Sequence, residues 1–171
     1  MLKTQFSPHF LFNTLNNLYS LCLQNGERAA EMVARLSEIM RYILDEGQNK
    51  RVPLQKEVEI LQAYLDMQLL KKSRSQNIEL NASGVTAKHK IAPLLLVGFL
   101  ENSFKHGDFT YDENGYLKMS INVNEDSKLH FLIENTTSSK GETSSGIGLR
   151  NAQRQLDLSY PNPVSYTHLT L

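Results

Sequence analysis

The architecture follows from one segment, Ala92-Pro93-Leu94-Leu95-Leu96-Val97-Gly98-Phe99-Leu100-Glu101-Asn102-Ser103-Phe104-Lys105-His106-Gly107. Its dense apolar residues predict a buried helix over residues 92–105, and Pro93 can start that helix because the first helical turn tolerates a missing N–H. Helical spacing puts four polar residues on one edge and leaves the other edges to four apolar ones: Glu101, Asn102, Lys105 and His106 against Leu94, Leu95, Val97 and Leu100. One edge is therefore suited to chemistry, although a solvated helix end would look the same in isolation.

The residues after this helix alternate between apolar and polar, as in a strand with one buried face. One alternating run covers residues 117–123, the turn signal Glu125-Asp126-Ser127 follows, and a second run covers residues 129–133. These runs predict an antiparallel hairpin, and Ile78 and Leu80 predict a short strand before the helix. The second half of the chain is therefore expected to be α+β, a sheet with helices on one face.

The first half of the chain has helical spacing. Ser7 is a good N-cap and Pro8 suits the first turn, so a helix is expected to begin there, with one apolar stripe of Leu11, Leu15, Leu18 and Cys22. Asn25-Gly26 predicts a left-handed stop. A second helix is expected to end at Gly47 and to bury the stripe Ala29, Val33, Leu36, Met40, Ile43 and Leu44.

These two helices form a hairpin, which cannot bury its apolar stripe alone. We therefore expect a second copy of the chain to complete a four-helix bundle, which makes the protein a homodimer. A third helical stretch runs from Leu54 to Leu69 and bridges the two halves. Cys22 is the single cysteine, so an intramolecular disulfide is excluded, and this residue is expected to lie in the core.

Composition narrows the classes of function. The chain has 171 residues, enough for a proper core. Its 18 basic and 18 acidic residues cancel, so no global field draws it to nucleic acid or to an anionic membrane. Hydrophobic residues at 40% and charged residues at 21% are typical of a globular chain. No apolar run approaches the roughly 18 to 20 residues of a membrane span, so we expect a soluble, cytosolic chain.

A second polar motif opens the chain, Leu2-Lys3-Thr4-Gln5-Phe6-Ser7-Pro8-His9-Phe10-Leu11-Phe12-Asn13-Thr14-Leu15-Asn16. It resembles the histidine box of LytS-type sensor histidine kinases, which centres on Pro-His-Phe-Leu-Phe-Asn. A histidine in the first turn of a helix can offer an imidazole nitrogen as a nucleophile near neutral pH. The resemblance implies that His9 accepts a phosphoryl group, whereas spacing alone would also allow a histidine that only caps its helix. Asn13, one turn on, either orients His9 or a water, or is an ordinary polar position of a bundle.

The segment from Pro93 to Gly107 is similar to the N box of the GHKL ATP-binding fold, which histidine kinases share with gyrase and Hsp90. A carboxamide oxygen is a suitable ligand for Mg²⁺, which usually keeps waters and takes other ligands from nucleotide phosphates. The resemblance gives that metal-binding role to Asn102. It also implies that Lys105 and His106 lie near the phosphates or ribose of ATP, and that Glu101 lies near the attacking group.

A glycine motif, Ser144-Ser145-Gly146-Ile147-Gly148-Leu149-Arg150-Asn151, resembles the G2 box of the same fold. Glycines let backbone N–H groups approach phosphate oxygens, and a helix that starts at Leu149 directs its N-terminal dipole the same way. The resemblance implies that Gly146, Gly148 and Leu149 bind ATP. The preceding residues 136–145 are expected to form a lid over the nucleotide.

One motif departs from the family, Phe131-Leu132-Ile133-Glu134-Asn135-Thr136-Thr137. Family members usually end this strand with Asp-x-Gly-x-Gly, and their aspartate accepts a hydrogen bond from the adenine amino group. Asn135 stands in the place of that aspartate, and the glycines are missing. Because an asparagine carbonyl can accept the same hydrogen bond, Asn135 stays the expected adenine contact.

The last motif, Leu156-Asp157-Leu158-Ser159-Tyr160-Pro161, resembles the family's helix that ends in Tyr-Pro, but no final strands follow it. We expect a helical hairpin over residues 1–50 that carries the phosphoacceptor, and a connecting helix over residues 51–75. A GHKL-type α/β sandwich that binds ATP and lacks its last strands would cover residues 76–163, and residues 164–171 would be a non-native tail. Family members carry an N-terminal membrane sensor, so this segment would be their cytoplasmic core.

The resemblance implies an ATP:protein-histidine phosphotransferase that uses ATP and Mg²⁺. Such an enzyme phosphorylates His9 and passes the phosphoryl group to an aspartate of a response regulator, often one with a LytTR-type DNA-binding domain. Two alternatives belong to other classes. A pseudokinase or dimeric scaffold without ATP turnover is favoured by Asn135 and by the shortened sheet. A GHKL ATPase would release phosphate even after the substitution His9→Ala.

Overall fold

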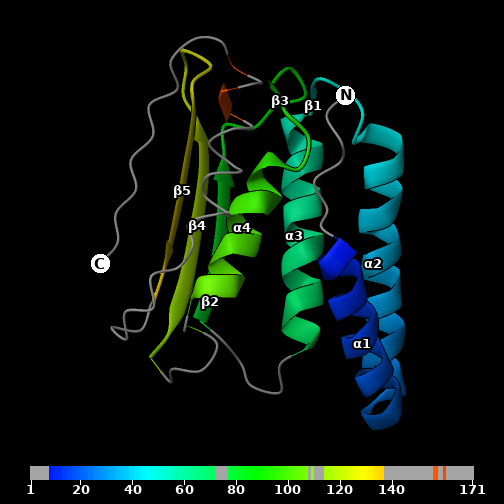
Figure 1. Ribbon diagram of the computed structural model, residues 1–171. Coiled ribbons are helices and arrows are strands. Elements are labelled where there is room, and N and C mark those ends of the chain that lie inside the picture. The colour runs from blue at the N-terminus through cyan, green and yellow to red at the C-terminus, as the bar shows by residue number, and fades with distance from the viewer. Residues whose placement is uncertain are drawn as a thin grey trace.

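The computed structural model describes residues 8–71, 77–107, 109, 114–136, 156, 157 and 160, with the backbone alone for residues 8–10 and 106. Its helices and strands follow one another (Figure 1) as α1 Pro8–Gln24, α2 Gly26–Glu46, β1 Val52–Pro53, α3 Leu54–Leu70, β2 Asn77–Ser83, β3 Lys90–Ile91, α4 Leu95–His106, β4 Tyr116–Val123 and β5 Leu129–Asn135. The expected α+β class is confirmed, because N-terminal helices precede a small mixed sheet.

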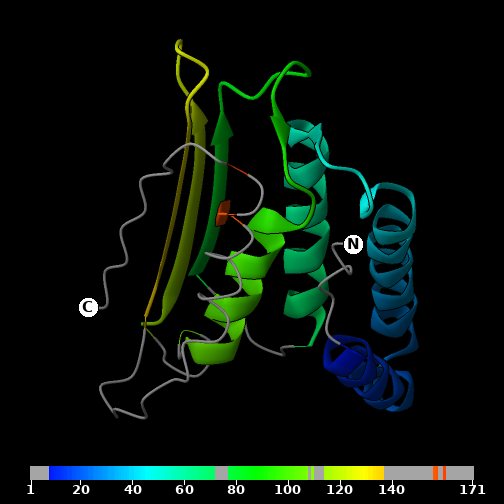
Figure 2. The ribbon, with the colours of Figure 1, turned by 45° about the horizontal axis from the view of Figure 1, so that its top comes forward.

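The elements are stacked in layers, which Figures 1 and 2 show from two directions. The outer layer is a sheet in the order β2-β4-β5, in which β4 is parallel to β2 and antiparallel to β5. The parallel pair follows from the path of the chain, because a crossover that contains α4 joins β2 to β4. α4 lies between the sheet and α3, α2 packs on α3, and α1 packs on α2.

The predicted antiparallel hairpin is confirmed as β4 and β5. The four alternating apolar residues of β4 are all buried, namely Leu117, Met119, Ile121 and Val123. The turn is closed by Asn124, whose Oδ1 accepts a hydrogen bond of 2.9 Å from the backbone N of Lys128, and Ser127 takes the left-handed conformation there with φ 59°. Alternation and a polar turn therefore decide this part of the fold locally.

The expected left-handed stop at Asn25-Gly26 is wrong. Asn25 has an extended backbone, with φ −156° and ψ 100°, and its side chain accepts a hydrogen bond of 3.1 Å from the backbone N of Arg28. It is thus the N-cap of α2, and Gly26 is the first residue of that helix. A side-chain cap needs no left-handed residue, so a single residue separates α1 from α2. Gly47 follows the last residue of α2, as predicted.

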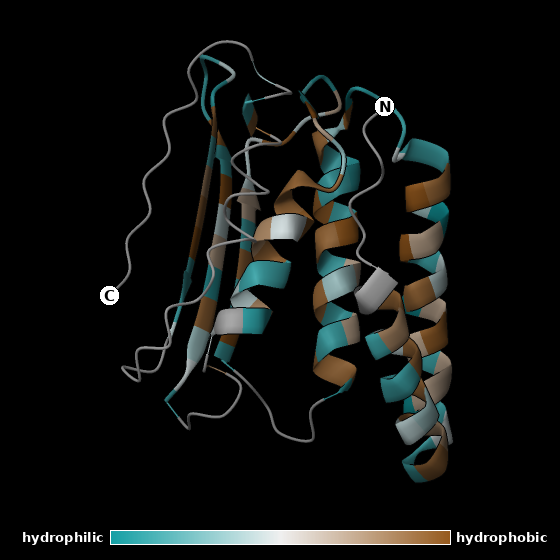
Figure 3. Cartoon of the chain, viewed as in Figure 1, coloured by the Kyte–Doolittle hydropathy of each residue, from teal (hydrophilic) through white to brown (hydrophobic). Residues whose placement is uncertain are grey.

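The stripes expected for the hairpin are partly wrong. The buried residues of α2 are Ala29, Met32, Leu36, Ile39 and Tyr42, whereas Val33 and Leu44 are 46% and 72% exposed. Cys22 is exposed and Leu21 is the buried residue of α1 beside it. Hydrophobic residues recur along α1 and α2 (Figure 3), and in α2 they occupy more than one face, since Val33 and Leu44 are exposed while Met32 and Ile39 are buried. Packing of α2 against both α1 and α3 selects the buried face.

The core is centred on α3, which lies between the hairpin and α4 (Figure 2). Its buried apolar residues are Leu54, Ile60, Leu61, Ala63, Tyr64, Leu65 and Met67. A short ladder that the sequence pattern did not predict fixes the start of this helix, because Val52 of β1 pairs with Ile91 of β3. The ladder therefore ties the entry of α3 to the segment that leads into α4.

Candidate functional site

The candidate site is the polar edge of α4. Glu101 and Asn102 are half-buried on this edge and Lys105 is exposed, whereas Leu95, Val97 and Leu100 are buried and the fourth predicted apolar residue, Leu94, is half-buried. The helix therefore divides as its spacing predicts, into one polar edge and a buried remainder. His106 is the last residue of α4, and its side chain lies outside the described residues.

Aromatic residues of α3, of α4 and of the segment after α4 pack together beside this edge. The Tyr64 side chain of α3 is 1% exposed, and its ring meets the ring of Phe104 edge-on at 6.4 Å between centroids. Phe104 in turn meets Phe109 at 5.2 Å. Burial raises the pKa of the Tyr64 hydroxyl, and the negative charge of Glu101 raises it further. Glu101 is thus close enough to a neutral, buried phenol to act on it electrostatically.

The end of α4 meets the end of β5 at Gly107. A Cβ at this position would lie 2.6 Å from the backbone O of Ser103, and 2.7 Å from both Asn135 Nδ2 and Phe109 Cδ1. These distances leave no space for a side chain, although the backbone of Gly107 is extended, with φ −87°. Glycine is therefore required here by close approach, which brings the C-terminal end of α4 beside Asn135.

Asn135 is the last residue of β5 and is half-buried. Its Nδ2 donates a hydrogen bond of 3.1 Å to the backbone O of Thr136. Thr136 is held by two hydrogen bonds with Tyr116 of β4, from its own backbone N to Tyr116 O at 3.1 Å and from Tyr116 N to its Oγ1 at 3.0 Å. Asn135, the adenine contact expected from the sequence, therefore lies at a strand end that hydrogen bonds to β4 hold in place.

The start of α4 differs from the prediction. The helix begins at Leu95 and not at Pro93, and its N-cap Leu94 has a left-handed backbone, with φ 61°, and makes no side-chain capping bond. The missing cap is replaced from α3, where Glu57 is 0% exposed and its Oε1 accepts a hydrogen bond of 2.6 Å from the backbone N of Leu94. A carboxyl at a helix N-terminus also suits the helix dipole.

Tyr42 of α2 completes this arrangement, because its hydroxyl donates a hydrogen bond of 2.5 Å to the same Oε1 of Glu57. Burial raises the pKa of Glu57, and it outweighs the hydrogen bonds from Tyr42 and from the amides of Leu94, Leu95 and Leu96, which lower it. The pKa of Tyr42 is raised by burial and by Glu57. Three helices thus meet at one carboxyl group.

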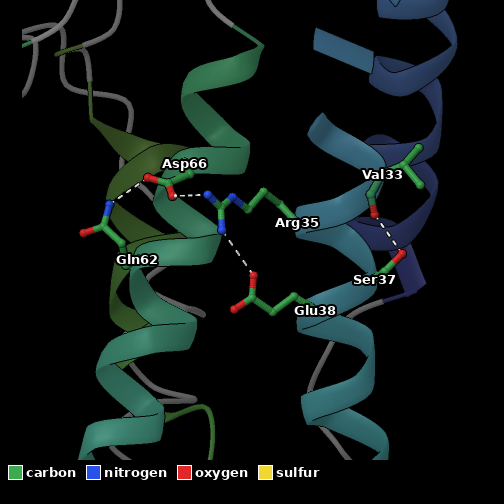
Figure 4. Close-up of polar contacts among 6 residues, drawn as sticks. All are labelled: Val33, Arg35, Ser37, Glu38, Gln62 and Asp66. Carbon is green, nitrogen blue, oxygen red and sulfur yellow. Dashed lines mark hydrogen bonds and ion pairs between the residues drawn. The ribbon is translucent and has the colours of Figure 1, made fainter. Parts of the chain in front are cut away.

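Further polar contacts join α2 to α3. Arg28 Nη2 donates a hydrogen bond of 2.6 Å to the backbone O of Leu70. Arg35 pairs with Asp66 at 3.5 Å and with Glu38 at 3.3 Å, and Gln62 donates to Asp66 at 2.7 Å (Figure 4). Lys56 pairs with Glu46 near the other end of the interface. We call Arg28, Arg35 and Tyr42, which are spaced by seven residues, the α2 polar stripe.

The other predicted site residues lie in the hairpin or outside the described residues. His9 is in the first turn of α1, where only its backbone is described, and Asn13 is exposed one turn later. Gly146, Gly148 and Leu149 lie outside the described residues, as do residues 161–171. Since α3 separates α4 from the hairpin in Figure 2, the structure does not bring α1 together with the polar edge of α4.

Sequence reasoning missed Glu57, Tyr42 and Gly107. Glu57 has a readable signal, because it stands with Leu54, Leu61 and Tyr64 on one face at positions i, i+3, i+7 and i+10, where apolar residues are expected. The described residues hold no group of three or more His, Cys, Asp or Glu side chains placed to bind a metal. In the same part of the chain, every helix is too short or too polar to cross a bilayer.

Comparison with known proteins agrees with the motifs. Residues 1–75 match the histidine kinase family model. The sensor protein LytS of Oceanobacillus iheyensis is 31% identical over 134 residues, which cover 78% of this chain and 23% of the relative. The sensor histidine kinase/phosphatase LytS of Staphylococcus aureus is 28% identical over 172 residues, which cover 91% of this chain and 29% of the relative.

The sensor protein LytS of Bacillus subtilis is 32% identical over 105 residues, which cover 61% of this chain and 18% of the relative. The chain therefore spans about a quarter of the length of the curated relatives that it matches. The matched region includes the histidine box and its two helices. The chain belongs to the family of LytS-type sensor histidine kinases, with its histidine kinase domain matched over residues 1–75.

Proposed function

We propose that this chain is the catalytic core of a two-component sensor histidine kinase. It uses ATP to phosphorylate itself on His9. It then passes the phosphoryl group to an aspartate of a response regulator that carries a LytTR-type DNA-binding domain. The observation that carries the proposal is the close approach at Gly107, which brings the C-terminal end of the helix with the polar edge, α4, beside the end of β5. A nucleotide needs both, because its phosphates and its base require separate contacts.

The transfer step needs little covalent help from the protein. An imidazole nitrogen of His9 attacks the γ-phosphorus, the P–O bond to the β-phosphate breaks, ADP leaves, and the imidazolium gives up one proton. Glu101 is the carboxyl that we assign to the attacking group, where it can accept that proton. Asn13 orients His9. Catalysis of this kind depends mainly on positioning and on neutralising phosphate charge.

The residues at the polar edge fit a nucleotide bound with Mg²⁺. The half-buried carboxamide of Asn102 offers a hard oxygen ligand, and bound Mg²⁺ would neutralise phosphate charge. Lys105 and His106 follow within one turn and suit the phosphates or the ribose. Asn135 uses Nδ2 for Thr136, so its Oδ1 is the atom that we assign to the adenine amino group. Backbone amides at Gly146, Gly148 and Leu149 would complete the phosphate contacts.

The hairpin is the proposed dimerisation element. Its large apolar side chains are exposed along α1 as Leu11, Phe12, Leu15, Tyr19 and Leu23. Such a row of exposed apolar side chains on one helix favours burial against a partner. A second copy of the same hairpin would bury the row and form a four-helix bundle. The curated relatives are named as sensor proteins, which supports placing this chain on the cytoplasmic side of a membrane-attached receptor.

The proposal is tested by incubating the chain with γ-labelled ATP and Mg²⁺, and by comparing it with the variants His9→Ala and Asn102→Ala. Acid-labile label on the parent, absent from both variants, is the expected result, because a phosphoramidate is unstable in acid. Asn16→Ala, a change of another exposed α1 amide, is the control that keeps the label. Phosphate release that persists in His9→Ala would point to an ATPase instead.

One observation favours a second candidate. Asn135 replaces the aspartate of the family, which weakens the argument for adenine binding, and a dimeric scaffold without ATP turnover would need no such contact. This candidate predicts dimers that bind no nucleotide. Direct titration of the chain with ATP and Mg²⁺, together with a measurement of its mass in solution, separates it from the kinase.

A further inference from the structure

The helix α4 depends on another element for its first turn. The first backbone N–H groups of any helix need partners outside it, and a side chain at the N-cap usually supplies one. Leu94 occupies that position, with a left-handed backbone and no capping side chain. The partner comes from α3, through the hydrogen bond of 2.6 Å between Glu57 Oε1 and the backbone N of Leu94.

The same carboxyl oxygen also belongs to the hairpin. Tyr42 of α2 donates to Glu57 Oε1 at 2.5 Å, so one atom receives donors from α2 and from the start of α4. Glu57 is 0% exposed and Tyr42 is 7% exposed, which leaves no bulk water to replace either donor. A shift of α2 along α3 must therefore change the hydrogen bonding of the group that caps α4.

The position of the first turn sets the position of the polar edge. α4 is a helix of 12 residues, about 18 Å long, and Glu101 and Asn102 lie in its C-terminal half, before the chain reaches Gly107. A rotation or slide at Leu94 is thus carried to these residues. At Gly107 there is no spare space, since an added Cβ would already contact Asn135 at 2.7 Å.

We propose that Glu57 is a positioning residue for the nucleotide-binding edge of α4, and that its hydrogen bond from Tyr42 makes this position depend on the docking of the hairpin. The inference rests on the proposed function, because it gives the polar edge of α4 the role of binding ATP. Neither residue touches the nucleotide in this scheme. Displacement of α2 loosens the cap, α4 shifts, and the affinity for ATP falls.

The test compares Tyr42→Phe, Glu57→Ala and Glu57→Gln with the parent, and uses Glu59→Gln as control, because Glu59 is an exposed carboxyl on the same helix. The first readout needs no nucleotide. Nuclear magnetic resonance signals of the Asn102 side-chain amide and of the Gly107 backbone amide report where the far end of α4 lies. We expect both to shift in Tyr42→Phe and Glu57→Ala, and to stay in place in Glu59→Gln.

The second readout is ATP affinity against the turnover of bound ATP. We expect the Kd for ATP to rise about tenfold in Glu57→Ala, which loses two hydrogen bonds, and about threefold in Tyr42→Phe, which loses one. Glu57→Gln should recover most of the affinity, because its amide oxygen can still accept from Leu94 and Tyr42. The rate constant of labelling at saturating ATP should change less than the Kd in every variant.

Unchanged Asn102 and Gly107 signals in Tyr42→Phe would overturn the inference, as would a Glu57→Gln variant no better than Glu57→Ala in Kd. If Glu57→Ala does not fold, Tyr42→Phe and Glu57→Gln decide the question. A parent chain that binds no ATP refutes the proposed function alone, and the resonance signals then still show whether Tyr42 and Glu57 position α4.

Discussion

The backbone of Gly107 passes the side chain of Asn135 so closely that a Cβ added to Gly107 would lie 2.7 Å from Asn135 Nδ2. The contact joins the end of the helix α4 to the end of the strand β5. It makes the relative position of two expected ATP contacts, Asn102 and Asn135, sensitive to a single methyl group.

Gly107→Ala is therefore expected to lower the free energy of unfolding by about 1–3 kcal/mol, because the new Cβ meets backbone and side-chain atoms on three sides. ATP affinity should fall with it. Gly98→Ala is the control, since a Cβ there has nothing within 4 Å, and this helical position should gain about 0.5–1 kcal/mol. Urea unfolding of both variants measures the two effects, and equal behaviour would contradict the close approach.

Asn135→Asp restores the residue that the family usually has. We expect the Kd for ATP to fall about fivefold, because a charged acceptor makes a stronger hydrogen bond to an amino group than a carboxamide does. Asn124→Asp introduces the same charge at the far end of the hairpin and should leave the Kd unchanged. Isothermal titration with ATP and Mg²⁺ gives both numbers, and an unchanged Kd in Asn135→Asp would argue against adenine at this position.

The raised pKa of Glu57 predicts a pH dependence of stability. Between its ordinary pKa of about 4.3 and its raised pKa in the fold, the native chain holds a proton that the unfolded chain has released. The contribution of Glu57 to the free energy of unfolding is therefore fully present below about pH 4.3, declines by about 1.4 kcal/mol per pH unit as the pH rises to the folded pKa, and is lost above it. Urea unfolding of the parent minus Glu57→Gln, from pH 4 upward, isolates this term, and a difference that grows with pH would reverse the sign.

Exposed apolar residues of α1 predict self-association. Phe12 is 67% exposed, and Phe12→Glu should weaken a dimer by about tenfold or more, because a buried phenylalanine contributes about 1.5–3 kcal/mol. Leu132 of β5 is also exposed, at 54%, and Leu132→Glu is the matched control away from the helical hairpin of α1 and α2. Sedimentation equilibrium measures both, and a parent chain that is monomeric at high concentration would refute the four-helix bundle.

Local pattern predicts most of the elements. The spacing of Leu54 to Leu69 gives α3, and the alternation of residues 117–123 gives β4, because each pattern depends only on neighbours along the chain. The pattern predicts the buried face of α2 only in part, since apolar residues occupy more than one face and packing on α3 decides which face is buried. Asn25 is ambiguous in the sequence for a related reason, because the same residue type can end one helix or cap the next.

The candidate site divides in the same way. Residues that share one helix, such as Glu101 and Asn102, could be grouped from spacing alone. Contacts between distant elements could not, and the left-handed Leu94 with its cap from Glu57 belongs to this kind. Pro93 misled the prediction because it satisfies the rule for a first turn, whereas the helix begins two residues later.

The α2 polar stripe has a consequence for engineering chimeric histidine kinases. Seven residues are close to two full turns, so Arg28, Arg35 and Tyr42 keep nearly the same phase, with a drift of about 20° per step. A foreign input module fused within α2 keeps these three residues on the side that faces α3 if the junction adds steps of seven residues. A junction two or five residues out of phase would rotate the helix by about 140–200°, which would turn the arginines away from Leu70 and Asp66 and leave Glu57 without its phenol. The helical repeat of α2 therefore limits which positions in this helix can serve as fusion points.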